Sequence, residues 1–415
     1  MDKMKIAYFS IEFPPRIFGG LGVYADFISR ELATLGNEVF VFTWGEPELK
    51  RRQSKSKVTA CREIPLPLKD SIEIFLSHET HAWGEGLEFL YDLLSFNQLA
   101  ASRFMDEGPF DLCVAHDWLG LPGAMAVKRR TGIPMIYHAH STEVGRSPAP
   151  NPQLVSLEAK GASLSDAIIT VSEAMRDGMV GQGIPEEKIH VCYNGVDTKV
   201  FSPPSTKPDT LDELRSRYSL EEEDQVILFL GRLEPVKGII QLIQSMHYVL
   251  LKNPSSKLLV VGRGTLLDIA KKEAMPLGDR VVFNTDFLDI SSKVHHYALA
   301  DLCVFPSLYE PFGIVALEAA SMEKPAVVGA SGISGLREIV ENPTSASPTG
   351  VHINPRDPRD IAWGINLALE DKDRLEIWGK NARKRCLENF TWRIAAEKTM
   401  QIYREVAEKV AKKQQ

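Results

Sequence analysis

Short apolar segments alternate with helical patterns along almost the whole chain. The first apolar segments, Lys5 to Ser10 and Glu38 to Trp44, flank a helical pattern from Val23 to Leu35. Parallel strands need a crossover helix between them, so this alternation predicts an α/β protein with parallel sheets and helices on both faces. The series continues with four more apolar segments: Asp111 to Ala115, Met135 to Ala139, Ala167 to Val171, and Ile189 to Tyr193.

A second series of predicted strands follows a break at the Asn194-Gly195 turn. A chain of 415 residues is also too long for a single core. We therefore predict two doubly wound domains, residues 1–200 and 201–390, joined near residues 195–210. We expect one helix through Trp378 to Lys413, with its end, about 391–415, packing back on the first domain. The strands predicted in the second domain are Val226 to Leu230, Lys257 to Val261, Arg280 to Phe283, Asp301 to Phe305, and Ala326 to Val328.

Composition excludes several classes of protein. The net charge of -7 lacks the basic excess of a duplex-binding protein, so we expect no nucleic-acid partner. The five cysteines are odd in number and form no CxxC, which favours a reducing, cytoplasmic setting. The sequence shows no leader and no apolar run near 18 residues, so we predict no membrane span. Peripheral membrane contact and the oligomeric state stay open.

Polar residues follow several predicted strands, where ligands bind in open α/β sheets. In the first domain, Asp117 and His140 stand at such strand exits. His138 and His140 could suggest a metal, but no third ligand is spaced nearby in the sequence. His138 is expected to be a strand residue that faces the other way from His140. The sequence therefore predicts no metal site.

Two cations follow the first strand of the second domain, within the stretch Gly231 to Gly238. A diphosphate can be held without a metal by Arg232, which offers paired donors, and by Lys237, which offers a point charge. The alternative is two surface cations beside a proline turn.

The stretch from Glu310 to Glu318 carries two carboxylates around a Pro-Gly turn. The amides from Gly313 to Val315 would be free donors at a helix start, where a phosphate binds well. Glu318 suits a ribose diol, since a carboxylate accepts from two neighbouring hydroxyls. The alternative is an exposed helix glutamate, but its apolar neighbours make an unpaired charge costly there.

Gly19 and Gly20 lie in a glycine-rich loop between a strand and a helix of the first domain. Glycines let the backbone approach a ligand closely. The loop is not GxGxxG and lacks a Walker lysine, so a plain flexible loop is an equal alternative.

In this order and spacing the motifs resemble the retaining glycosyltransferases of the GT-B fold. The resemblance is to glycosyltransferase family 4, in the large group with glycogen, starch and sucrose synthases, and especially to archaeal glycogen synthase-like proteins. It implies two Rossmann-like domains that face a central cleft. It rests on the loop at 19–22, His116-Asp117-Trp118, His140, Asn194 to Asp197, Gly231-Arg232, Lys237-Gly238, and the Glu310 to Glu318 stretch.

The resemblance also implies roles for the site residues. Arg232 and Lys237 would bind the donor diphosphate and stabilise its departure. Glu310 would contact sugar hydroxyls, Glu318 would hold the ribose, and Asp117 and His140 would line the sugar site, with His140 near the 6-hydroxyl. The remaining donor-binding positions would be Gly19, Gly20, Gly231, Phe312, Gly313, Ile314 and Val315.

The implied reaction is transfer of a hexose, glucose first, from ADP- or UDP-glucose to a hydroxyl acceptor such as an α-glucan. It would retain the anomeric configuration and need no metal or other cofactor. Three alternatives stay open. The first is a mannosyl- or other hexosyltransferase acting on a small or lipid-linked acceptor. The others are a phosphorylase-like enzyme with a pyridoxal phosphate lysine and a non-catalytic nucleotide-sugar-binding protein.

Overall fold

The computed structural model describes residues 3–17, 19–44, 58–62, 85–147, 149–203 and 208–414. Residues 204–207, in the predicted junction, therefore lie outside the described part. The chain folds into two compact units. The first comprises Met1–Val171, Met179–Cys192 and Ala395–Gln415, and the second comprises Ser172–Gly178 and Tyr193–Ile394.

The first unit is built on a parallel sheet of seven strands among the described residues, in the order β3-β2-β1-β4-β5-β6-β7. The strands that follow β1 extend toward one edge of the sheet, and those that follow β4 extend toward the other edge. The sheet therefore has a topological switch point between β1 and β4. The strands are β1 (Lys5–Phe9), β2 (Glu38–Phe42), β3 (Val58–Arg62), β4 (Leu112–His116), β5 (Met135–Ala139), β6 (Ala167–Thr170) and β7 (Ile189–Val191).

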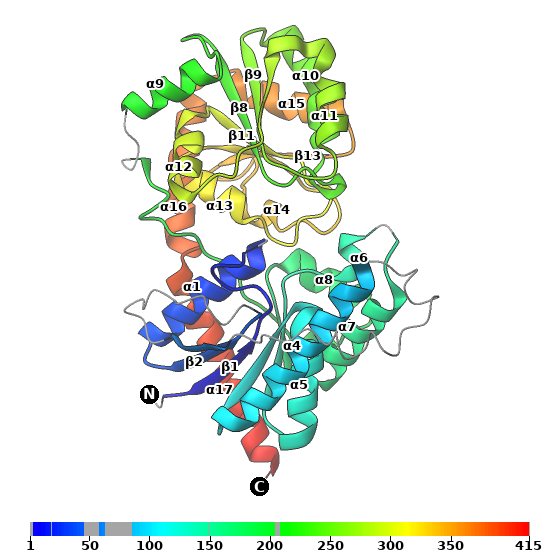
Figure 1. Ribbon diagram of the computed structural model, residues 1–415. Coiled ribbons are helices and arrows are strands. Elements are labelled where there is room, and N and C mark those ends of the chain that lie inside the picture. Colours follow the sequence, from blue (N-terminus) through cyan, green and yellow to red (C-terminus); the bar gives the residue numbers. More distant parts are fainter. Residues whose placement is uncertain are drawn as a thin grey trace, which may run out of the picture. The chain divides into compact units, whose positions relative to one another are not determined.

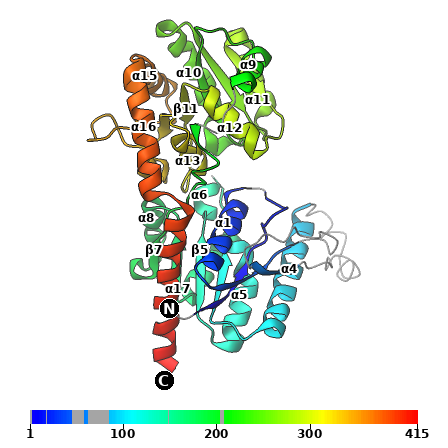
Figure 2. The ribbon, with the colours of Figure 1, turned by 90° about the vertical axis from the view of Figure 1, so that its left-hand side faces the viewer.

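Helices cover both faces of this sheet (Figures 1 and 2). On one face, α1 (Gly20–Thr34) buries Leu21, Tyr24, Ile28 and Leu32, whose spacing is that of a helix stripe. From Ala395 onward α17 joins this face, where the hydroxyls of Tyr403 and Tyr8 lie 3.0 Å apart. The other helices are α4 (Glu85–Glu107), α5 (Asp117–Thr131) and α7 (Pro152–Leu164) on the second face, and α6 (Glu143–Arg146) and α8 (Glu173–Gly181) after β5 and β6.

The second unit has a parallel sheet of six strands within the described ranges, in the order β10-β9-β8-β11-β12-β13. Its switch point lies between β8 and β11, and the first strands of the unit are fully buried. The strands are β8 (Gln225–Leu230), β9 (Ser256–Val261), β10 (Val281–Asn284), β11 (Leu302–Phe305), β12 (Ala326–Gly329) and β13 (Gly350–Ile353).

Two groups of helices lie on either side of this sheet (Figure 1). In the first group, α10 packs against both α11 and α15. In the second group, α12 packs on α9, and α13 packs on α16. The helices of the first group are α10 (Ile239–Lys252), α11 (Leu267–Ala274) and α15 (Pro358–Leu369). The remaining helices of the unit are α9 (Pro208–Arg217), α12 (Ile290–Leu299), α13 (Ile314–Ser321), α14 (Leu336–Ile339) and α16 (Lys372–Asn389).

The predicted α/β class and every predicted strand are confirmed, while β3 and β13 were not predicted. The continuous helix expected from Trp378 to Lys413 is wrong. α16 ends at Asn389, and α17 (Trp392–Gln414) begins after a break. The N–H of Val196 donates to the Phe390 carbonyl at 2.9 Å, and Val196 also bridges to Thr391, which takes these two residues out of the helix.

Within the described part of the chain, no helix combines the length and apolarity needed to cross a membrane. The four cysteines with described side chains, Cys113, Cys192, Cys303 and Cys386, are free and buried.

We expect Gly120→Ala to destabilise the first unit. A Cβ at this position of α5 would stand 2.3 Å from the carbonyl oxygen of Phe9 in β1, so α5 would have to move off the sheet. Glycine-to-alanine changes usually stabilise a helix by about 0.5–1 kcal/mol, whereas overpacking costs about 1–3 kcal/mol. Chemical denaturation should show that loss. Gly181→Ala, with no atom within 4 Å of its Cβ, is the control. A Gly120→Ala variant as stable as wild type would contradict the close packing.

Candidate active site

Asp117, the first residue of α5, ties two strand exits of the first unit together. Its Oδ1 accepts the N–H groups of His140 at 2.7 Å and of Ser141 at 3.2 Å. Its φ of 52° lies in the left-handed region, which is uncommon outside glycine and clusters at functional sites. Burial raises the pKa of Asp117 to about 6, against the opposing effect of Arg146. Two predicted site residues are thus in direct contact.

Three histidine rings gather at the same strand ends. His116 Nδ1 and His140 Nε2 are 3.1 Å apart. The rings of His138 and His140 stack, with centroids 4.3 Å apart and planes 5° apart. The prediction that His138 faces away from His140 is wrong, because residues two apart along a strand point to the same face of a sheet. The sequence also missed His116 as their neighbour, since it comes from a different strand.

The glycine loop before α1 is bound by a carboxylate of this chain. Oε2 of Glu12 accepts the N–H groups of Gly19 at 3.0 Å and of Gly22 at 3.3 Å. These are helix-start amides of the kind that bind anions. Gly20 is exposed beside them. The amides of the loop are therefore placed to meet a negative charge, and in this structure the carboxylate of Glu12 meets them.

An arginine and two glutamates extend the polar cluster behind Asp117. Arg146 lies 3.2 Å from Glu143 and 3.9 Å from Glu158, and both oxygens of Glu158 accept the N–H of Glu143 at 3.0 and 3.1 Å. Burial raises the pKa of Glu158 to about 7, while the bond from Glu143 and the charge of Arg146 act in the opposite direction. Sequence reasoning did not find Glu158.

In the second unit, the residues predicted to hold a donor lie at the switch point of the sheet. Lys237 ends a short 3-10 helix (Pro235–Lys237) after β8, and Glu310 follows β11. Lys237 Nζ is 2.5 Å from Glu310 Oε2, which also accepts the hydroxyl of Ser307 at 3.2 Å. The structure thus pairs Lys237, predicted to bind phosphate, with Glu310, predicted to bind the sugar, in a largely buried ion pair.

Glycines bring the backbone of these loops close together. Gly238 has a φ of 69°, and a Cβ there would lie 2.0 Å from the Pro306 carbonyl oxygen. After the next strand, a Cβ at Gly262 would lie 1.9 Å from the Gly231 carbonyl oxygen. Arg232, beside Gly231, has an exposed side chain and makes no ion pair with any residue that the structure describes, as expected for either a free ligand-binding cation or a surface cation.

Glu318 is buried in α13 and has two partners. Its Oε2 accepts the hydroxyl of Tyr297 at 2.8 Å, and its Oε1 lies 3.7 Å from Lys293 Nζ. The alternative of an exposed helix glutamate is therefore excluded. Neither Tyr297 nor Lys293, both on α12, was found from the sequence. Their spacing of four residues on one helix face was the available signal.

The start of α13 is fixed by tight packing. Gly313 has a φ of 107°, and a Cβ there would meet Leu336 Cδ2 at 2.4 Å. The amides of Ile314 and Val315 come first in the helix, so they have no acceptor within it. Phe312 is buried and stacks on Tyr193, with ring centroids 5.8 Å apart. Its side chain therefore anchors the loop, and only its backbone is placed to meet a ligand.

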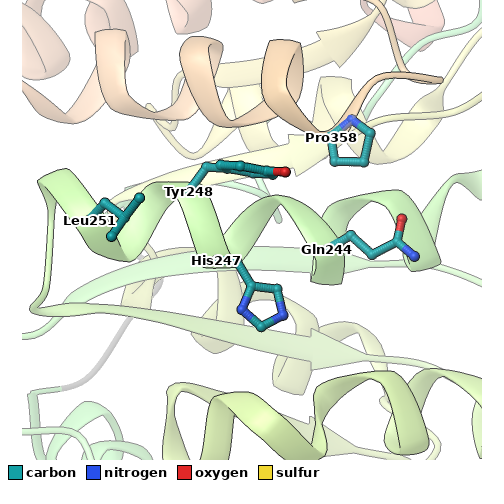
Figure 3. Close-up of a pocket in the computed structure, with 5 residues that line it drawn as sticks. All are labelled: Gln244, His247, Tyr248, Leu251 and Pro358. Carbon is teal, nitrogen blue, oxygen red and sulfur yellow. The ribbon is translucent and has the colours of Figure 1, made fainter.

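A surface pocket of the second unit lies apart from these residues. It is about 460 Å³ in volume and is formed by α10 and the start of α15 (Figure 3). None of the predicted site residues lines it; the lining residues are Gln244, His247, Tyr248, Leu251 and Pro358.

Two protein-family models match the chain, one for each part of the predicted site. Residues 18–200 match "Glycosyltransferase Family 4", and residues 211–385 match "Glycosyl transferases group 1". A glycosyltransferase of Methanocaldococcus jannaschii, MJ1607, is 30% identical over 97% of this chain and 98% of its own length. A glycogen synthase of Mycobacterium tuberculosis is 30% identical over 96% and 94%.

Solved structures share the fold over the whole chain. Sucrose-phosphate synthase from Thermosynechococcus elongatus superposes with a TM-score of 0.78 at 23% identity, covering 97% of this chain and 99% of that one. The catalytic domain of starch synthase IV from Arabidopsis thaliana has a TM-score of 0.74 at 16% identity, covering 98% and 100%. Two doubly wound domains of this kind define the GT-B class of glycosyltransferases. Within that class, the chain belongs to glycosyltransferase family 4.

We expect Glu158 to make the first unit less stable as pH rises. Its folded-state pKa of about 7 exceeds its ordinary value of 4.5, so the folded state binds the proton more tightly, and that stabilisation is lost between about pH 4.5 and 7. Glu158→Gln keeps an acceptor for Glu143. The variant should be more stable than wild type at pH 8 by about 1–2 kcal/mol, after allowance for solvent screening, and equal to it near pH 4.5.

Denaturation of both proteins across this pH range measures the difference. The exposed Glu408→Gln is the control for the loss of a surface carboxylate. A Glu158→Gln variant whose stability follows the wild-type pH curve would show that Glu158 is not held in this way.

Proposed function

We propose that the protein is a retaining glycosyltransferase that moves a hexose from a nucleoside diphosphate sugar to a hydroxyl acceptor. Glucose from ADP- or UDP-glucose is the proposed donor group, and an α-glucan is the proposed acceptor. The observation that carries this proposal is the second unit's Glu310 to Glu318 segment. It holds a carboxylate paired with Lys237 at one end and a buried carboxylate, held by Tyr297, at the other.

The buried Glu318 fits a ribose diol. One of its oxygens already accepts from Tyr297, which fixes the carboxylate in place. The other oxygen faces Lys293 at 3.7 Å, too long for a strong hydrogen bond, so it keeps acceptor capacity for ribose hydroxyls. A preset carboxylate loses little conformational entropy when the nucleotide binds.

The diphosphate would lie between the start of α13 and the two cations. The amides of Ile314 and Val315 supply helix-start donors, and Arg232 has no competing ion pair among the described residues. Lys237 would exchange its bond to Glu310 for the phosphates. That exchange would free Glu310 to accept hydroxyls of the sugar, so one ion pair keeps both groups in place before the donor arrives.

The chemistry follows from the charge that develops as the diphosphate leaves. Donors aimed at that charge supply the main stabilisation, so Lys237 and Arg232 are the proposed catalytic cations. A double displacement would need a nucleophilic carboxylate with a second carboxyl group beside it. Glu310 has Lys237 and Ser307 as its partners instead. We therefore propose same-face attack with the leaving phosphate as base. A covalent sugar trapped on Glu310 would contradict this mechanism.

Asp117 and His140 are the first unit's proposed contribution to the sugar site. Asp117 fixes the backbone of His140 through the 2.7 Å bond, and His140 would meet the sugar's 6-hydroxyl. The glycine loop at Gly19 and Gly20 would join the donor if a phosphate displaced Glu12 from its amides. We propose no metal for the transfer itself, since the two cations take that role. Four buried free thiols suit a reducing, cytoplasmic location.

The named relatives support the proposal and define its alternative. Glycogen synthase is the name of one relative, and the starch synthase structure was solved with ADP and acarbose. Relatives at 27% identity are named alpha-maltose-1-phosphate synthase and D-inositol 3-phosphate glycosyltransferase. A phosphorylated small molecule is thus the second proposed acceptor class, in place of a glucan. A different hexose, such as mannose, belongs to the same alternative.

We expect ADP or UDP to raise the melting temperature of the protein, and Glu318→Gln to reduce that shift. Ligand at 100 times its Kd stabilises the folded state by about 2.7 kcal/mol. Gln keeps an acceptor for Tyr297 but loses the charge that the ribose hydroxyls meet. A thermal-shift screen of nucleoside diphosphates measures both effects, with the exposed Glu388→Gln as control. If no nucleoside diphosphate shifts the melting temperature, the donor-site assignment is wrong.

We expect Lys237→Ala and Arg232→Ala each to cut turnover by about 10²–10³-fold, because each removes a donor to the leaving charge. Glucose transfer to glycogen, to maltose and to inositol phosphate should be assayed with each nucleotide sugar, which also separates the two acceptor classes. The exposed Lys271→Ala is the control. Near-normal turnover in either variant would remove that residue from the phosphate site. Donor binding without transfer or hydrolysis would favour a non-catalytic sensor.

A further inference from the structure

The three histidines at the ends of β4 and β5 form a compact group of potential metal ligands. One nitrogen from each of His116, His138 and His140 lies within 4.8 Å of the others. His116 and His138 are fully buried, and His140 is partly accessible. The group therefore has two fixed ligands inside the unit and one at an open side.

Several of these ring nitrogens are buried without a hydrogen bond to the part of the fold that the structure describes. Neither ring nitrogen of His138 has a hydrogen-bond partner among the described residues, and neither does Nε2 of His116. An unsatisfied buried polar atom costs about 1–3 kcal/mol. Burying His138, which within the described part of the chain has no partner for either of its ring nitrogens, is therefore unfavourable for structure alone. Neutral imidazole nitrogens are, by contrast, what Zn²⁺ and related ions bind.

The spacing is close to that of a metal site. Two nitrogens on one tetrahedral Zn²⁺ lie about 3.3 Å apart, given Zn–N bonds of about 2.0–2.1 Å. His116 Nδ1 and His140 Nε2 are already 3.1 Å apart. The third nitrogen lies within 4.8 Å, so the His138 ring would have to move by no more than about 1.5 Å and turn out of its stack on His140.

We propose that His116, His138 and His140 bind Zn²⁺ as a three-histidine site with one open coordination position. The hydrogen now shared between His116 and His140 moves to the second nitrogen of the ring that carries it, so both facing nitrogens can give their lone pairs to the ion. Asp117, bound to the His140 N–H at 2.7 Å, supplies nearby negative charge. The open position lies on the accessible side of His140 and takes water.

Zinc bound in this way withdraws His140 from the sugar. This consequence rests on the proposed function, because it assumes that His140 meets the donor sugar. The transfer itself uses Arg232 and Lys237 rather than a metal. Zinc therefore acts as an inhibitor of the transferase, and chelation restores activity.

The test compares metal binding by wild-type protein and by two variants of a residue outside the proposed catalytic machinery. His138→Gln and His138→Leu both keep a side chain of moderate size in the buried space. Titration calorimetry with Zn²⁺ and the visible spectrum of the Co²⁺ form should show one ion per wild-type chain. Both variants should bind the ion at least about 10–100-fold more weakly. Even the mutation of a residue that only supports a metal ligand typically costs that much affinity.

His247→Gln, at an exposed position of α10, is the matched control and should bind zinc like wild type. Zinc should inhibit glucose transfer by wild type and by this control, but not by the His138 variants. Equal zinc binding by wild type and the folded His138 variants, or no binding by wild type, would overturn the site. Zinc that binds the triad without slowing transfer would overturn its coupling to His140. Zinc binding at the triad in a protein that transfers no sugar would leave this site intact and refute only the proposed function.

Discussion

The ion pair between Lys237 and Glu310 is the contact on which the candidate site depends. It joins the loop after β8 to the loop after β11, the two strands at the switch point of the second sheet. The backbone supports it, since Leu308 donates its N–H to the Val236 carbonyl at 2.8 Å. A largely buried ion pair is costly to break by removing one partner. In the proposed function a diphosphate would replace Glu310 as the partner of Lys237, because it brings its own negative charge.

The same design recurs in the first unit with a different interaction. There a strained aspartate at the end of β4 accepts two amides from the end of β5, and the histidine cluster lies beside it. In both units, the polar groups of the candidate site gather where parallel strands end, because the strands themselves carry mostly apolar side chains on both faces. The candidate site residues are thereby placed at one edge of each sheet.

The sequence predicted the strands well because each is a short, mostly apolar run between helices. It missed β13, whose Gly350 to Ile353 run follows a long polar loop, and it missed the helix break, which a distant contact from Val196 imposes. Arg232, Lys237, Glu310 and Glu318 could be found because they stand at strand exits or helix starts. Glu12 could not, since it acts through a tertiary hydrogen bond that no local spacing reveals. For Tyr297, which also acts through a tertiary hydrogen bond, the sequence offered no more than its four-residue spacing from Lys293.

The most direct test of the account is a structure of the protein with ADP or UDP bound. The account predicts ribose hydroxyls within about 2.6–3.2 Å of the Glu318 carboxylate, phosphates on the amides of Ile314 and Val315, and Lys237 moved from Glu310 to a phosphate oxygen. A nucleotide bound elsewhere, such as in the pocket of α10 and α15, or one with its phosphates turned away from α13, would contradict the central claim.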